Sequence, residues 1–565
     1  AASYTAGRSG IAMSSNATRV LVVGAGPVGL ALAGDLGWRG IDCLLIEQSD
    51  GAIQQPKMDL VGIRTMEHCR RWGIVKDVEN SPYPRDYPQD NVYLTSLGGY
   101  ELGREQFPPL GEEKPPPQSP QKRERCPQNL FDPILRAFAG RQRSVELQYL
   151  TKLMDLRFEG GGVVACVRDE RAGEERELVA DFVAGCDGAH STVRELLGIR
   201  MLGNPALTYT TNIIFRCADL AARHPGRKPY RYILLGPEGT WATIVAINGG
   251  DQWRMSIIGG ETPRDLSTDN IHAAIRRAIG PLLQYEILTV VPWVRKELVA
   301  ESYRKGPAFI LGDAAHVMSP TGAYGMNTGI GDAVDLSWKL AAVVEGWGGE
   351  TLLDSFDAER RPIAVRNVKE ASGNLRRMLS PGRNEELLDD TEAGAALRRR
   401  VGAAMTEAMR QEWFTLGMHL GYRYEDSPVC VPDGTAPTPD DTRNYIPTTR
   451  HGSRAPHVWL DDSRSTLDLF GRSFVLLRLG ARAPDVAPLV QAARQRRVPL
   501  EVVSIEERAV VSAYERRLVL VRPDGHIAWR GDDLADPRMV IDTVCGLDER
   551  AGLTSASPSP SHQVA

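Results

Sequence analysis

One stretch near the N-terminus, residues 20–47, constrains the fold more than any other. Residues 18–23 form a short run, rich in β-branched side chains, that suits a strand buried on both faces. The run leads into Gly24-Ala25-Gly26-Pro27-Val28-Gly29, which has the GxGxxG spacing of a dinucleotide-binding turn. Gly24 permits the tight turn, Gly26 lets the backbone approach a pyrophosphate, and Gly29 allows helix and strand to pack closely. The stretch therefore predicts a strand, a glycine turn and a helix whose N-terminus faces a phosphate.

An acidic residue completes this unit. A second apolar run, residues 42–46, ends at Glu47, about 20 residues after the turn. An acid at this position accepts hydrogen bonds from ribose hydroxyls and disfavours a 2′-phosphate. We therefore expect the tightly held nucleotide to be FAD or NAD, and not NADP.

Length, charge and cysteine spacing narrow the class of protein. A chain of 565 residues is several times the ~150 residues of an average domain, so we expect three folding units. The net charge of −5 gives no electrostatic reason to expect nucleic acid or an anionic membrane as a partner. No apolar run approaches the ~20 residues of a membrane span, and the first residues lack a signal-peptide core, so we expect a cytoplasmic protein. The eight cysteines never form CxxC, which argues against a redox dithiol, a zinc site or a disulfide framework.

Further along, the hydrophobic patterns predict a sheet, helices and a second α/β unit. Residues 205–300 contain several strand-like runs and predict a mainly antiparallel sheet. Residues 428–447 include five prolines and are typical of a linker. Helices are expected over 64–72, 128–139, 326–344 and much of 370–425, and strands alternate with a helix over 452–547.

Three separated segments together resemble the fingerprints of one enzyme family. They are the GAGPVG turn with Glu47, the segment GCDGAHSTVR at 185–194 and the segment GDAAHVMSPTGAYGMNTGIGDAVDLSWKL at 312–340. This set resembles the class A flavoprotein monooxygenases, which are single-component, FAD-dependent aromatic hydroxylases. Within that family the chain is similar to phenol-hydroxylase-type members that carry a thioredoxin-like C-terminal domain. The resemblance covers residues 19–370 and, more weakly, 452–531.

The resemblance implies a mixed α/β and α+β fold, with a Rossmann-like FAD-binding domain, an inserted antiparallel-sheet substrate domain and a C-terminal thioredoxin-like domain. Because the last domain has no CxxC, we expect it to serve structure or homodimer contacts and not redox work. All three fingerprints precede Pro447, so the residues after it are expected to be dispensable for FAD binding. The expected units are a discontinuous FAD-binding domain (17–85, 122–200 and 301–370), a sheet domain (86–121 and 201–300), a helical segment (371–427), a linker (428–451) and the thioredoxin-like domain (452–550).

The resemblance also implies cofactor contacts. Asp313 would hydrogen-bond the ribityl or pyrophosphate group of noncovalently bound FAD, and Asp187 would lie behind the pyrophosphate, although an Asp-Gly pair is by itself a common turn. The backbone at 325–327 would face the flavin pyrimidine edge, where a helix N-terminus favours the negative charge of reduced flavin. Lys57 stands where an arginine is common in the family, and Gln48 where a basic residue is frequent. The expected contacts are Gly24, Gly26, Pro27, Val28, Gly29, Glu47, Gln48, Lys57, Gln128, Asp187, Asp313, Pro320, Gly325, Met326 and Asn327.

The implied reaction is hydroxylation of a phenolic or polyketide-type aromatic substrate. The chain has one nucleotide fingerprint, so NADPH or NADH is expected to visit, reduce FAD and leave; in the family, O2 then forms a flavin hydroperoxide that transfers its distal oxygen to the ring. Asp59 coincides with the aspartate that phenol hydroxylases place over the substrate hydroxyl. A carboxylate in an apolar pocket could have a pKa raised into the range of a general base; an exposed loop aspartate is the alternative.

Different interpretations apply to single residues and to the whole chain. His316 is expected to be structural because no acid partner is identifiable from the sequence, and Trp241 and Trp253 are expected in the sheet core more than in a cavity wall. A non-catalytic FAD-binding protein is the alternative from a different class. A flavin-dependent halogenase shares the fold, but its WxWxIP segment is missing here.

Overall fold

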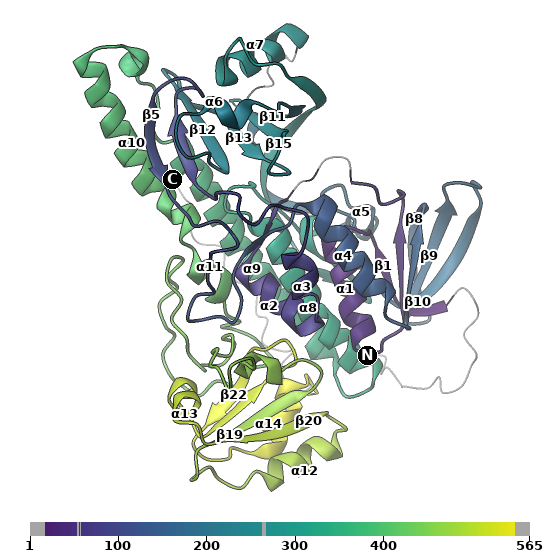
Figure 1. Ribbon diagram of the computed structural model, residues 1–565. Helices are drawn as coiled ribbons and strands as arrows, with labels where there is room; N and C mark the ends of the chain where they lie inside the picture. The colour runs from purple at the N-terminus through teal and green to yellow at the C-terminus, as the bar shows by residue number, and fades with distance from the viewer. Residues whose placement is uncertain (1–16, 54–55, 57, 261, 263–266, 548–565) are drawn as a thin grey trace, which may run out of the picture.

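The computed structural model describes residues 17–53, 56, 58–260, 262 and 267–547. Figure 1 shows a central α/β unit, a sheet unit at the top of the view and a C-terminal α/β unit, in yellow, at the bottom. This mixed α/β and α+β architecture confirms the predicted fold class.

The central unit is built on a sheet whose core strands run parallel. Its order is β16-β17-β10-β1-β2-β7, and β8 and β9 extend it antiparallel from β10. Val20, Leu21 and Val22 of β1 are fully buried, as predicted for a strand covered on both faces. The strands are β1 (Ala17–Val23), β2 (Cys43–Glu47), β7 (Val145–Tyr149), β8 (Thr151–Glu159), β9 (Gly162–Asp169), β10 (Glu175–Gly185), β16 (Arg304–Lys305) and β17 (Ala308–Ile310).

Helices cover this sheet, and three of them, over 63–72, 128–140 and 324–344, lie within two residues of the predicted bounds. The first helix starts at Pro27, directly after the glycine turn. The helix over 63–72 ends at Gly73, whose φ of 73° is the left-handed C-cap conformation that glycine adopts easily. The helices of this unit are α1 (Pro27–Trp38), α2 (Ile63–Trp72), α3 (Val75–Glu79), α4 (Gln128–Gly140), α5 (Thr192–Leu197), α8 (Tyr324–Val344) and α9 (Glu350–Leu379).

The second unit is an eight-stranded, mainly antiparallel sheet in the order β18-β15-β11-β14-β13-β12-β4-β5. The edge strand β5 and its neighbour β4 come from an earlier part of the chain, residues 91–105, and β4 pairs parallel with β12. The strands are β4 (Asn91–Leu94), β5 (Glu101–Glu105), β11 (Met201–Arg216), β12 (Arg231–Gly236), β13 (Gly239–Ala246), β14 (Gln252–Ile258), β15 (Glu286–Ala300) and β18 (His316–Val317). Helices α6 (Leu220–Arg223), α7 (Thr268–Ile279) and α10 (Glu392–Trp413) accompany it (Figure 1), and α11 (Leu416–Leu420) lies against α2 of the central unit.

The C-terminal unit is a four-stranded sheet in the order β20-β19-β21-β22, flanked by helices. β19 pairs parallel with β20 and antiparallel with β21, so the sheet is mixed. Its elements are β19 (Phe474–Leu479), α12 (Ala487–Gln495), β20 (Leu500–Ile505), α13 (Arg508–Tyr514), β21 (Leu518–Val521), β22 (Ile527–Gly531) and α14 (Pro537–Val544).

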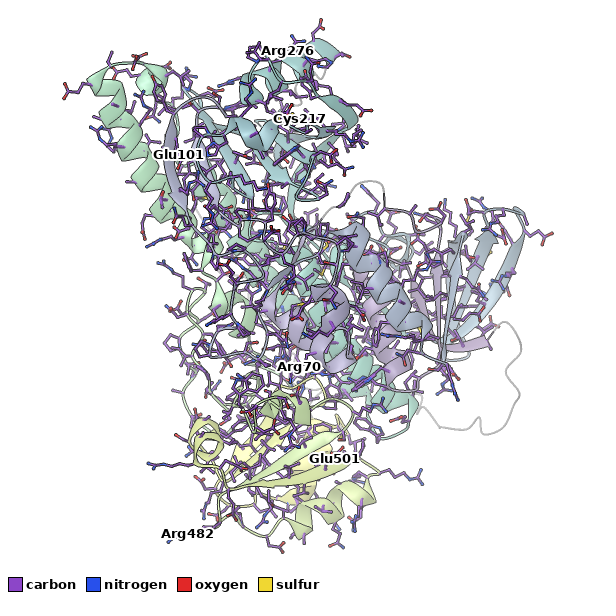
Figure 2. The ribbon with its side chains drawn as sticks, viewed as in Figure 1. Arg70, Glu101, Cys217, Arg276, Arg482 and Glu501 are labelled. Carbon is purple, nitrogen blue, oxygen red and sulfur yellow. The ribbon has the colours of Figure 1, made fainter. Side chains whose placement is uncertain are left out.

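This unit is joined to the central unit through buried charges. Arg522 lies 3.0 Å from Asp335 on α8 and 2.5 Å from Glu359 on α9, and all three side chains are buried. Arg454 pairs with Glu67 on α2. Figure 2 labels Arg70 at this junction, where its guanidinium lies 2.7 Å from Asp468. These pairs cross the junction, so the C-terminal unit supplies buried partners to charged residues of the central unit. That FAD binding does not require the residues after Pro447 stays a prediction.

The segment 428–451 has no helix or strand, as expected of a linker, but it packs closely against the body of the protein. The amide of Met418 donates to the carbonyl of Thr442, and Arg366 pairs with Asp440 at 2.7 Å. Over the described residues, no helix combines the length and the apolar character that a membrane crossing requires.

Candidate functional site

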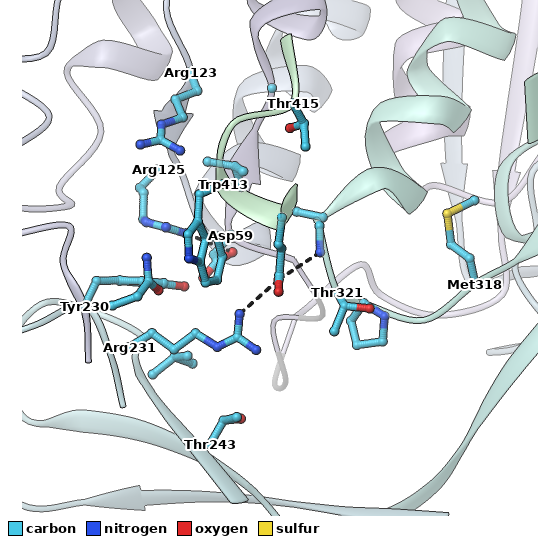
Figure 3. Close-up of a pocket in the computed structure, with 18 of the residues that line it drawn as sticks. Asp59, Arg123, Arg125, Tyr230, Arg231, Thr243, Met318, Thr321, Trp413 and Thr415 are labelled. Carbon is cyan, nitrogen blue, oxygen red and sulfur yellow. Dashed lines mark hydrogen bonds and ion pairs between the residues drawn. The ribbon is translucent and has the colours of Figure 1, made fainter. Parts of the chain in front are cut away.

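A cavity of about 1100 Å³ lies between the central unit and the inner face of the second sheet. Its walls come from the segment before α8, from strands β11 to β15, and from two stretches far along the chain, residues 412–416 and 443–445 (Figure 3). Asp59, Asp313 and Pro320 line this cavity, so the structure brings three of the predicted site residues to one place.

The glycine turn has the geometry that a bound pyrophosphate needs. Gly24 has a φ of 105°, and a Cβ there would lie 2.6 Å from the carbonyl oxygen of Cys186. A Cβ on Gly29 would lie 1.9 Å from the carbonyl oxygen of Gly24. At Gly26, which caps α1, a Cβ would meet no atom within 4 Å. The first and third glycines are therefore required by the protein's own packing, and the second leaves an open space in front of the helix N-terminus that fits a phosphate group.

The acid at the end of β2 lies beside this turn. Glu47 accepts a hydrogen bond from the amide of Ala25 at 2.9 Å and another from the amide of Ser49 at 2.8 Å. Val28 packs against Gly312 and Gly329, where added Cβ atoms would clash with its methyl groups. Gln48 is exposed. Lys57 lies outside the described residues.

Asp187 and Gln128 are held by local hydrogen bonds. Asp187 accepts from the Ser191 hydroxyl at 2.5 Å and from the amide of Val193 at 3.0 Å, which fixes the start of α5. Burial raises the pKa of the Asp187 carboxyl. Gln128 opens α4 and donates from its side chain to Asp132 at 3.0 Å; burial raises the pKa of Asp132 to about 7.

The first turn of α8 carries the residues 325–327 that the sequence predicts at a flavin edge. Ala323, which precedes this turn, has a φ of 57°. The Asn327 amide oxygen accepts from the Gly62 amide at 2.8 Å and from the Thr65 hydroxyl at 2.7 Å. Asn327 therefore joins the start of α8 to the segment that carries Asp59. The unpaired amides that every helix has in its first turn also lie here, which suits an electron-rich ring edge.

Asp59 lies at the beginning of a two-stranded ladder formed by β3 (Leu60–Val61) and β6 (Glu124–Arg125). Leu60 pairs with Arg125 in this ladder, which brings the Asp59 carboxylate 3.3 Å from the Arg125 guanidinium. Arg125 in turn lies over the ring of Tyr230, 3.3 Å from its centroid (Figure 3). The surroundings of Asp59 thus differ from the apolar pocket expected from the sequence, because a cation holds the carboxylate from one side.

The inner face of the sheet contributes arginines that the sequence analysis did not single out. Arg231 on β12 lies 3.0 Å from Glu412, and the same glutamate accepts from the amide of Gly322 at 3.0 Å; dashed lines mark both contacts in Figure 3. Arg254 on β14 and Arg295 on β15 also line the cavity. Arg231 begins the otherwise apolar strand β12, and an arginine in such a place can face a polar cavity. Arg254 and Arg295 lie in strands with other polar residues, so their sequences carried no comparable signal.

Trp241, Trp253 and His316, which the sequence predicts to be structural, are buried inside the protein. Trp241 and Trp253 belong to the buried core of the sheet unit, and neither is part of the cavity wall described here. His316 is fully buried and has an acid partner that the sequence could not identify, because its Nε2 lies 2.8 Å from Asp332. Burial opposes ionisation of Asp332, but Arg360 and His316 outweigh it and lower the pKa of this carboxyl.

Two protein families match the sequence over separate ranges. The family described as FAD binding domain matches residues 17–371, and the family described as aromatic-ring hydroxylase, C-terminal, matches residues 448–547. The first match covers more than half of the chain and includes all three fingerprints.

Relatives and solved structures match along nearly the whole chain. An FAD-dependent monooxygenase of Emericella nidulans is 32% identical over 557 residues, which cover 92% of this chain and 88% of that protein. A 4-methyl-5-nitrocatechol 5-monooxygenase of a Burkholderia species is 31% identical, with coverage of 92% and 96%. The structure of RebC soaked with chromopyrrolic acid, with bound 7-carboxy-K252c, superposes with a TM-score of 0.88 at 36% identity and covers 95% of this chain and 100% of that one.

Proposed function

Because this chain belongs to the FAD-dependent aromatic-ring hydroxylases, we propose that it hydroxylates a phenolic or polyketide-type aromatic substrate at the cavity between its two larger units. The observation that carries the proposal is the meeting of Asp59, Asp313 and the segment before α8 around one cavity. NADPH or NADH is the proposed reductant and O2 the proposed oxidant.

The residues around the glycine turn fit FAD. Gly26 leaves space for the pyrophosphate, and Glu47 lies where ribose hydroxyls are expected. Asp313 lies within a 3-10 turn over Gly312–Ala314 and lines the cavity. Asp187, Gln128 and the first turn of α8 complete the proposed contacts. When bound, FAD supplies the redox chemistry with O2, while the protein binds, orients and shields the substrate.

We assign to Asp59 the role of accepting the proton of the substrate hydroxyl. A deprotonated phenol oxygen makes the ring more nucleophilic, and a carboxylate within hydrogen-bond distance of that hydroxyl can take the proton. The ladder of β3 and β6 fixes the position of Asp59, and Arg125 orients its carboxylate from the other side. Arg125 is a positioning residue in this proposal.

The cavity wall also limits access of water. Phe107, Trp293, Trp413 and Phe414 present apolar surface to the cavity. Exclusion of water limits side reactions of the reactive intermediates and strengthens polar interactions inside the site. The stretch that contributes Trp413 and Phe414 lies beyond the first matched family range, so we assign a part of the substrate site to residues 412–416.

We also propose the domain boundaries that the sequence predicts, and a cytoplasmic location. A homodimer is consistent with the absence of a CxxC pair from the C-terminal unit, which leaves that unit to structural roles.

The proposed function is tested with a panel of phenols, aromatic acids and aromatic polyketides. The purified protein should release about one equivalent of FAD on denaturation, and at least one panel member should stimulate NAD(P)H oxidation and O2 uptake with formation of a hydroxylated product. A flavin-bearing protein whose NAD(P)H oxidation responds to no panel member would favour the non-catalytic alternative.

A further inference from the structure

Two arginines of the cavity wall that are buried or half-buried have no carboxylate partner among the described residues. Arg295 is only 3% exposed, and Arg254 is half-buried. Arg295 donates to the hydroxyls of Thr210 and Ser319, at 3.2 Å each, and Arg254 donates to the carbonyl of Pro56 at 3.1 Å. Within the described residues, no carboxylate oxygen lies within 4 Å of either guanidinium.

Of the remaining arginines around the cavity, Arg443 is exposed and has no ion pair among the described residues, whereas the other three are paired with carboxylates. Arg123 pairs with Glu113, Arg125 with Asp59 and Arg231 with Glu412. The acids of these three pairs also line the cavity. Arg254 and Arg295 therefore differ from the paired arginines in lacking such a neighbour. A buried cation without a directly paired carboxylate is costly, so such a guanidinium in a cavity wall suits an anionic ligand; Asp59 acts on Arg254 and Glu412 acts on Arg295 only from beyond ion-pair distance.

The two unpaired arginines lie on one face of the sheet, six positions apart along β11, where Arg254 pairs with Ile214 and Arg295 pairs with Thr208. Arg254 lies in the row Arg231–Val245–Arg254 across β12, β13 and β14. Arg295 lies on β15, and its Nε bonds to Thr210 of β11, the strand between β14 and β15. Burial lowers the pKa of Arg295 to about 10; the like charges of Arg231 and Arg254 add to this effect, and the carboxylate of Glu412 partly opposes it. An anion between Arg254 and Arg295 would relieve this repulsion.

We infer that the aromatic substrate carries a carboxylate, and that Arg254 and Arg295 bind it on the sheet face of the cavity. Arg295 uses Nε for Thr210 and Nη1 for Ser319, which fixes its guanidinium and leaves Nη2 to donate a charge-assisted hydrogen bond to a ligand carboxylate. This inference rests on the proposed function and adds to it the class of substrate: an aromatic acid with a ring hydroxyl near Asp59.

The test compares aromatic acids with their uncharged esters. The probes are salicylic acid and 3-hydroxy-2-naphthoic acid with their methyl esters, and binding to the FAD-loaded enzyme is measured by isothermal titration calorimetry without a reductant. We expect at least one acid to bind about tenfold or more tightly than its ester, since hydrogen bonds to charged groups are strong. Arg295→Gln and Arg254→Gln should each reduce this ratio to about twofold or less, while Arg295→Lys, which keeps the charge and loses the guanidinium, should give an intermediate ratio.

Two controls test whether the effect belongs to these two arginines and to a carboxylate. Arg123→Gln removes a paired cation of the same wall and should retain the preference for the acid. Kd values for NADPH and NADH are measured with the same variants; if Arg295→Gln weakens these nucleotides and not the acids, the arginines serve a nucleotide phosphate and the inference is overturned. Equal binding of acid and ester by the unmodified enzyme, or no detectable binding of either acid, also overturns it.

The test separates this inference from the proposed function. If the enzyme hydroxylates panel members but does not prefer acids, the proposed function stands and this inference fails. If the enzyme prefers acids but turns over no panel member, the proposed function is contradicted and the carboxylate site remains.

Discussion

At the scale of single residues, Asp59 carries the proposed chemistry. Asn at this position preserves shape and hydrogen bonding but cannot accept a proton at neutral pH. We therefore expect Asp59→Asn to lower the rate of product formation about 10²- to 10⁴-fold while FAD content stays close to normal. Product and peroxide are measured together, because NAD(P)H oxidation can continue without oxygen transfer. Asp77→Asn, at an exposed aspartate of α3, is the matched control, and normal product formation by Asp59→Asn would remove Asp59 from the mechanism.

The glycines of the turn give a second prediction at this scale. The Cβ of Gly26→Ala would meet no protein atom within 4 Å, and its φ of −72° suits alanine, so the apoprotein should melt within a few degrees of the unmodified apoprotein. The methyl group would instead occupy the space proposed for the pyrophosphate, and we expect the Kd for FAD to rise about tenfold or more. Gly29→Ala should instead lower the Tm of the apoprotein itself, because its Cβ would lie 1.9 Å from the Gly24 carbonyl oxygen. Unchanged FAD affinity in Gly26→Ala would place the pyrophosphate elsewhere.

At the scale of elements, α8 connects the parts of the site. In its first turn, Asn327 accepts a hydrogen bond from the segment that follows Asp59. In its middle, Asp332 contacts His316 and the amide of Gly312. In its second half, Asp335 pairs with Arg522 of the C-terminal unit. The helix is therefore fixed along its length by buried polar contacts, in addition to the apolar packing that its sequence predicts.

The segment that leads into β22 places a buried histidine at the junction, and we expect this residue to make the stability depend on pH. His526 is buried beside the Tyr424 ring, and burial lowers the pKa of this histidine from 6.5 to about 4. The unfolded chain therefore binds a proton at His526 before the folded protein does, and stability is lost as the pH falls from about 6.5 towards 4. The shift corresponds to about 3 kcal/mol at most. We expect His526→Asn to flatten the decline of Tm between these pH values; an unchanged slope would show that different groups govern it.

At the scale of the whole molecule, the C-terminal unit stabilises the central one. A chain that ends at Pro447 would leave Glu359, Asp335 and Glu67 without Arg522 and Arg454, and the loss of one partner from a buried ion pair typically costs about 3–5 kcal/mol. It would also uncover Trp338, which packs edge-on against Phe474. We expect the truncated protein to be poorly soluble or to melt well below the full chain, as measured by thermal denaturation. A soluble truncated protein with normal Tm and FAD content would show that the units are independent.

The sequence predicts the nucleotide half of the site better than the substrate half. The glycine turn, Glu47 and the start of α8 are local patterns, each with a backbone requirement that is recognisable in the sequence. The substrate half depends on pairing between distant segments. Arg125 reaches Asp59 only through the ladder of β3 and β6, and Glu412 reaches Arg231 only because α10 packs against the edge of the sheet. The charged junction with the C-terminal unit is equally long-range, since Arg454 and Glu67 are separated by 387 residues.

The central claim is that this protein inserts an atom of O2 into an aromatic ring. The most direct measurement is the mass of the product formed from the best substrate of the panel under 18O2, with NADPH or NADH as reductant, compared with a parallel reaction in H2 18O. We predict that one atom of 18O enters the product under 18O2 and that none enters from labelled water. A hydroxylated product whose new oxygen comes from water, or consumption of O2 with no labelled product, would contradict the claim.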